Sequence, residues 1–194
     1  GVVLFHLLPF EQKYLAGASI VPAGLVIGQA GVDVFFVISG FIVTITSQGR
    51  GGGAGPAIGF LRRRLLRIYP TYWVYFALLA MVHAVAPGLM NHHATAQPSL
   101  LSSFLLLPSA APPLLLVAWT LTFELYFYLV FAVLLCAVPR HRLGGVLLGW
   151  AAVIVAGRLW LAPPFSPVID LLFNPLNLEF IAGCLIAVWV PRGS

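Results

Sequence analysis

The sequence predicts an all-α protein, a polytopic membrane helix bundle with a partial first helix and about five full transmembrane helices. Hydrophobic residues make up 61% of the 194 residues and charged residues only 8%, whereas about a quarter of a soluble domain is charged. The apolar residues come in blocks of about 20, the length that crosses the hydrocarbon core as a helix. They do not alternate with polar residues as barrel strands would. We therefore expect a single membrane domain over residues 1–194.

The apolar blocks give the helix boundaries in chain order. The first is a remnant from Val2 to about Leu8, because the chain is apolar at once and no basic region precedes it. We therefore expect the sequence to begin inside a first membrane helix. The other helices are expected at Leu25–Thr46, Ile68–Ala86, Leu116–Val138, Leu143–Leu161 and Leu172–Val190.

The segment Leu100–Leu107 is apolar but too short to cross a bilayer, and prolines follow it. If it does not cross, eight of the ten Lys and Arg residues fall on one side, and that side should be cytoplasmic. These eight are Arg50, Arg62, Arg63, Arg64, Arg67, Arg140, Arg142 and Arg192. The segments Phe10–Gly24, Pro87–Pro113 and Ala162–Asp170 are then extracytoplasmic. We expect a multi-pass protein of the bacterial inner membrane, in contact with membrane lipid.

Other features of the composition exclude several kinds of site. The net charge of +5 indicates cytoplasmic loops rather than a nucleic-acid partner. Cys136 and Cys184 lie in apolar runs and are expected to be reduced, buried packing residues. His92 and His93 lack further ligands at a suitable spacing, so no metal site is expected. The Gly-rich stretch Gly49–Gly59 lacks the Gly-Lys-Ser/Thr ending of a phosphate-binding loop and is interpreted as a linker.

Ionisable residues inside apolar blocks are costly and are therefore candidates for function. Four stand out: His6, Asp33, Glu124 and Glu179. His6 alone could be a hydrogen-bonded packing residue, and Glu124 a neutral or paired carboxyl group. Together they could be a catalytic base and the group that orients it. A structural role for Asp33 is as plausible as a catalytic one, and Glu179 is more often structural.

A group of arginines occupies the segment Leu61–Pro70. Ordinary anchoring at the cytoplasmic border would explain it. Arg64 and Arg67, however, are three residues apart and share a helix face. Such a face can bind phosphate groups through paired hydrogen bonds. Both interpretations remain open from these residues alone.

The chain resembles acyltransferase family 3 in three motifs, which occur in the family's order. They are Gly31–Phe41 (GVDVFFVISGF), Arg64–Pro70 (RLLRIYP) and Trp119–Tyr128 (WTLTFELYFY). His6 also matches the family's first-helix histidine. The stretch Phe104–Phe131 is most similar to the exopolysaccharide-modifying branch of the family.

The resemblance implies a membrane O-acyltransferase. Such an enzyme would move an acyl group, expected to be acetyl, from cytoplasmic acyl-coenzyme A to a hydroxyl of an extracytoplasmic or lipid-linked carbohydrate such as exopolysaccharide. His6 would be the catalytic base and Glu124 its partner, while Arg64 and Arg67 would bind the donor, with no metal. The family's arginine upstream of the histidine and its later helices lie outside this sequence. The piece by itself is therefore expected to be inactive.

A non-enzymatic exporter or flippase of lipid-linked polysaccharide is the competing interpretation. It would use the same His and Glu for proton relay and the arginines for anionic head groups. An enzyme should release free thiol from acetyl-coenzyme A, whereas an exporter should not.

Overall fold

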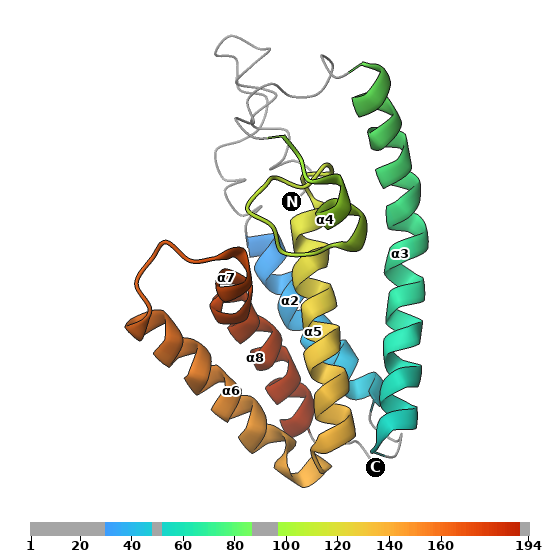
Figure 1. Ribbon diagram of the computed structural model, residues 1–194. Coiled ribbons are helices and arrows are strands. Elements are labelled where there is room, and N and C mark those ends of the chain that lie inside the picture. Colours follow the sequence, from blue (N-terminus) through green and yellow to red (C-terminus); the bar gives the residue numbers. More distant parts are fainter. Residues whose placement is uncertain (1–29, 48–51, 87–96, 191–194) are drawn as a thin grey trace, which may run out of the picture. The chain divides into compact units, whose positions relative to one another are not determined.

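The structure, a computed structural model, describes residues 30–47, 52–86 and 97–190, and every regular element in these ranges is a helix (Figure 1). Within these ranges, five helical stretches are long and apolar enough to cross a membrane: Ala30–Ser47, Ala54–Val85, Ala118–Ala137, Arg140–Trp160 and Pro167–Trp189. The predicted all-α multi-pass membrane fold is confirmed. The remnant Val2–Leu8 lies outside the described residues. The single domain over residues 1–194 stays a prediction.

The described residues form two compact units. One contains α2 (Ala30–Ser47) and α8 (Leu176–Trp189). The other contains the helices between them, which are α3 (Ala54–Val85), α4 (Leu100–Leu105), α5 (Ala118–Ala137), α6 (Arg140–Trp160) and α7 (Pro167–Phe173).

In the first unit, α2 and α8 cross at two glycines. A Cβ atom on Gly40 would overlap the carbonyl group of Phe180, and one on Gly183 would overlap the carbonyl group of Val37. Glycine at such a crossing lets two membrane helices approach until their backbones touch. The thiol of Cys184 donates to the carbonyl oxygen of Gly40 at 3.4 Å. The first motif therefore supplies one half of a tight helix pair.

The α2–α8 pair is parallel. Asp33 is close enough to Glu179 to interact with it electrostatically, and farther along both helices Thr44 bonds to Cys184. Three membrane helices, α3, α5 and α6, lie between α2 and α8 in the chain. α2 and α8 should therefore cross the membrane in the same direction. An additional crossing near α4 would have made them antiparallel. α4 is also only about 9 Å long at 1.5 Å per residue, which agrees with the prediction that this segment does not cross.

The predicted boundaries of two helices in the second unit are nearly correct. α5 and α6 begin and end within three residues of the predicted Leu116–Val138 and Leu143–Leu161. The predicted helix Leu172–Val190 is instead divided into α7 and α8. The division falls at Pro175, which has no backbone N–H to continue a helix. Both cysteines are free, but only Cys184 is buried, and the expected burial of Cys136 is wrong.

The predicted start of the third helix at Ile68 is also wrong, because α3 begins at Ala54. Glycines and arginines make residues 54–67 resemble a loop in hydropathy. Pro56 is tolerated there, since the N–H groups of the first helical turn have no intrahelical partner. Ala57 and Phe60 are buried, which stabilises the helix by packing. The Gly-rich linker is therefore shorter than predicted, and all of Arg62–Arg67 lies within α3.

The helices α3 and α5 are antiparallel, and their register places Arg64 beside Tyr128. The N–H of Gly53 donates to the carbonyl oxygen of Leu135 at 3.3 Å, and the ring of Phe60 lies 5.5 Å from that of Phe131. Farther along α3, the Arg64 guanidinium carbon lies 5.4 Å from the ring centroid of Tyr128. Tyr128 is at the centre of α5. Arg64 is thus level with the middle of α5. On α3 itself it precedes the long apolar part of the helix, so its expected place on the cytoplasmic side stays a prediction.

The aromatic residues that follow the arginines hold α4. Tyr69, Tyr72 and Trp73 donate hydrogen bonds to three successive carbonyl groups, those of residues 103–105. These bonds fix a short helix against the side of α3, beside the first turn of α5 (Figure 1).

Cysteine labelling should report the sides of the membrane. A Cβ atom added at Gly52 would lie 3.5 Å from the carbonyl oxygen of Leu135, near the end of α5. His141 follows α5 directly. Gly52 and His141 therefore lie at the same end of the unit. Cysteines at Gly52 and His141 should react only with permeant thiol reagents in intact cells. A cysteine at Gln97 should react with impermeant ones. Labelling of Gly52 from outside would contradict this orientation.

Candidate active site

The centre of α5 carries a polar cluster, formed with α3. The hydroxyl of Tyr128 donates a hydrogen bond to the carboxylate of Glu124, one helical turn earlier. The guanidinium group of Arg64 lies over two rings, 5.4 Å from that of Tyr128 and 5.7 Å from that of Phe60. The Phe60 and Tyr128 rings meet edge to face. Aromatic packing from both helices therefore positions Arg64.

Arg67 belongs to the same cluster. It lies one turn farther along α3 and is close enough to act electrostatically on Tyr128, as Arg64 does. The sequence singled out Arg64, Arg67 and Glu124 separately, and the structure groups all three around one tyrosine. Tyr128 was not predicted as a site residue. Its spacing of four residues from Glu124 on one helix was the available signal.

The cluster combines two cations with one carboxylate in a partly buried setting. Tyr128 is only 2% exposed, Glu124 and Arg64 are half-buried, and Arg67 is exposed. Charges interact more strongly where water is excluded. Paired guanidinium groups can bind a phosphate, and a carboxylate fixed by a hydroxyl can orient a neighbouring imidazole. The arrangement is therefore suited to binding an anionic donor next to an acid–base group.

The remaining candidates lie elsewhere. His6 is outside the described residues, as are His92 and His93. Asp33 and Glu179 lie in the other unit, where Asp33 is exposed and Glu179 half-buried. Their roles remain predictions. Within the described ranges no three His, Cys, Asp or Glu side chains gather as metal ligands would. The absence of a metal from the site likewise remains a prediction.

Comparison with known proteins identifies related chains. The family model Acyl_transf_3, described as an acyltransferase domain, matches residues 1–194. The exopolysaccharide production protein ExoZ of Rhizobium meliloti (strain 1021) is 36% identical over 174 residues, which cover 86% of this chain and 52% of the relative. Nodulation protein 10 of Rhizobium leguminosarum bv. viciae is 29% identical, covering 88% and 51% respectively.

A third relative is the acyltransferase MdmB of Streptomyces mycarofaciens, which is 26% identical over 94% of this chain and 53% of the relative. The chain thus spans about half the length of the curated relatives it matches. No solved structure shows a significant match.

Proposed function

Since the chain belongs to acyltransferase family 3, we propose that the complete protein transfers an acyl group from acyl-coenzyme A to a carbohydrate hydroxyl. The donor is acetyl-coenzyme A, and the acceptor is extracytoplasmic or lipid-linked, such as an exopolysaccharide. One relative is named for exopolysaccharide production and another as an acyltransferase. The observation that carries the proposal is the cluster of Arg64, Glu124 and Tyr128 at the centre of α5.

The proposed chemistry is general-base acyl transfer. A sugar hydroxyl is a poor nucleophile at neutral pH, so the imidazole of His6 removes its proton as the oxygen attacks the thioester carbonyl. The new C–O bond forms, the C–S bond breaks, and the imidazolium gives its proton to the sulfur, so that coenzyme A leaves as the thiol. Glu124 stabilises the imidazolium and selects its tautomer. General-base assistance of this kind is worth about 10² to 10⁴ in rate.

In this proposal Tyr128 is a positioning residue. Its hydroxyl holds the Glu124 carboxylate in one orientation, and its ring supports the Arg64 guanidinium. One side chain therefore links the donor-binding cation to the acid–base pair. Precise placement matters because productive transfer needs the reacting groups held in close contact.

Removal of Arg64 should weaken donor binding in the complete protein. Arg64→Ala should raise the KM for acetyl-coenzyme A by about 10-fold to 150-fold, since a hydrogen bond to a charged group contributes about 1.5–3 kcal/mol. The matched control is Arg62→Ala, because Arg62 is exposed on the same helix and should change the KM little. Equal, mild effects at both positions would instead favour simple membrane anchoring.

The proposed function is tested with the complete protein in membranes. Membranes containing it should release free thiol from acetyl-coenzyme A in the presence of deacylated polysaccharide from the producing cell. The carbohydrate should gain an ester that mild alkali removes. Transport of lipid-linked polysaccharide without thiol release would contradict the proposal and support an exporter.

A further inference from the structure

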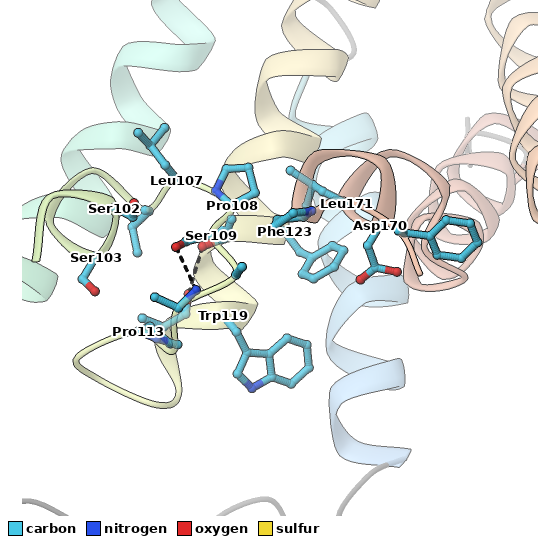
Figure 2. A pocket seen from close by; sticks show the side chains of 17 residues that line it. Ser102, Ser103, Leu107, Pro108, Ser109, Pro113, Trp119, Phe123, Asp170 and Leu171 are labelled. Carbon is cyan, nitrogen blue, oxygen red and sulfur yellow. Dashed lines mark hydrogen bonds between the residues drawn. The ribbon is translucent and has the colours of Figure 1, made fainter. Parts of the chain in front are cut away.

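A pocket of about 400 Å³ opens beside the first turns of α5 (Figure 2). Ser102 and Ser103 of α4 lie on one side, and Asp170 and Leu171 of α7 lie on the other. The connection between α4 and α5 and the residues of α5 itself complete the lining. The volume falls in the range of small-molecule binding sites.

The charge of this pocket does not suit a polyanionic donor. Among the described residues that line it, Asp170 is acidic and none is a lysine, arginine or histidine. Arg158 forms an ion pair with Asp170 at 3.1 Å, and its guanidinium carbon is 4.9 Å from the centroid of the Phe165 ring. A carboxylate fixed in this way accepts hydrogen bonds from hydroxyl groups, and the lining offers no cation to a phosphate.

The lining also combines aromatic faces with scattered hydroxyl groups. Trp119 and Phe123 are neighbours on one face of α5, with ring centroids 6.1 Å apart. Ser102 and Ser109 add hydroxyl groups to the same lining. The C–H face of a sugar ring packs against an aromatic ring, while its hydroxyls bond to carboxylate and serine oxygens. This mixture of apolar surface and a few polar groups is typical of a specific ligand site.

The pocket lies on the expected extracytoplasmic side of the polar cluster. It surrounds the start of α5, whereas Arg140 and Arg142 follow the other end of that helix. Phe123 lines the pocket and is followed directly by Glu124. At 1.5 Å per residue, Trp119 precedes Glu124 by about 7.5 Å along the helix axis.

We infer that this pocket binds the carbohydrate acceptor, with Trp119 stacking on a neutral sugar ring and Asp170 accepting its hydroxyls. The inference rests on the proposed function, because the pocket would present one acceptor hydroxyl toward Glu124. The donor then approaches through Arg64 and Arg67, and the acceptor from the opposite end of α5.

Thiol protection tests binding without requiring transfer. In the purified complete protein, Ser109→Cys introduces a thiol into the pocket lining, in a background with the exposed Cys136 changed to serine. Deacylated oligosaccharides from the producing cell's polysaccharide should slow maleimide labelling of this cysteine at least fivefold. Coenzyme A at the same concentration should not. Protection by coenzyme A alone, or by neither compound, would overturn the inference.

Kinetics test the same site independently. Trp119→Leu should raise the KM for the oligosaccharide at least tenfold and leave the KM for acetyl-coenzyme A unchanged. Trp160→Leu is the matched control, since Trp160 is 88% exposed on α6 and does not line the pocket. An unchanged acceptor KM in Trp119→Leu would overturn the inference. Oligosaccharide protection without any thiol release would refute the proposed function while leaving the binding site intact.

Discussion

Replacing Glu124 with alanine in the complete protein should abolish most acyl transfer while expression stays normal. Without this carboxylate, the imidazole of His6 would lose the partner that fixes its tautomer and stabilises its charged form. Loss of general-base assistance lowers the rate by about 10² to 10⁴. His6→Ala should have a similar effect. The measurement is thiol release from acetyl-coenzyme A at saturating acceptor, corrected for protein amount.

The losses of rate caused by the two substitutions should be far from additive, because either one alone already removes the catalysis that the two residues provide together. The double variant should therefore be little worse than either single one. Tyr128→Phe should cause a smaller loss in kcat, since the ring supporting Arg64 remains and only the hydroxyl bond to Glu124 is removed. Tyr126→Phe, on another face of α5, is the control. A stable, fully active His6→Ala variant would contradict the mechanism.

Side chains added at the α2–α8 crossing should strongly destabilise the protein. Leucine at Gly183 would have to displace the backbone of Val37 and Phe41, and valine at Gly40 that of Phe180. Overpacking typically costs about 1–3 kcal/mol, and here the obstructing atoms belong to the backbone, which cannot rotate away. We expect a large loss of monodisperse protein after detergent extraction, together with a lower thermal unfolding midpoint.

Gly149→Leu provides the matched control for this experiment. Gly149 is also inside a membrane helix, yet a Cβ atom there would meet nothing within 4 Å. Replacing glycine in a helix interior by a better helix former usually stabilises the helix by up to about 1 kcal/mol. The control should therefore unfold no earlier than the original protein. Equal destabilisation at Gly149 and Gly183 would show that the crossing is not unusually tight.

Hydropathy was sufficient to locate α5 and α6, because their apolar stretches coincide with the helices. It failed for α3, where the residues that begin the helix are glycines and arginines. Helix formation there depends on contacts with α5, such as those of Phe60, and these contacts join residues far apart in the chain. A local average of hydropathy contains no information about such contacts.

The candidate site could be predicted only in part, because it too depends on contacts between residues far apart in the chain. Arg64, Arg67 and Glu124 were identifiable one by one as charged residues in or beside apolar segments. Their grouping around Tyr128 depends on the antiparallel register of α3 and α5, which the sequence alone does not determine. The pocket was not predicted, because a proline-rich connection and α7 build it from separate parts of the chain.

The four arginines in the first half of α3 have a consequence for how the protein is made. An arginine carried to the centre of the bilayer costs about 2.5–3.5 kcal/mol, so this half of α3 should stay outside the hydrocarbon core while the helix leaves the translocon alone. The packing partner of Phe60 and Arg64 is Tyr128 of α5, which is synthesised later. We expect residues 54–67 to become ordered only when α5 pairs with α3, so that truncation before α5 leaves them open to protease.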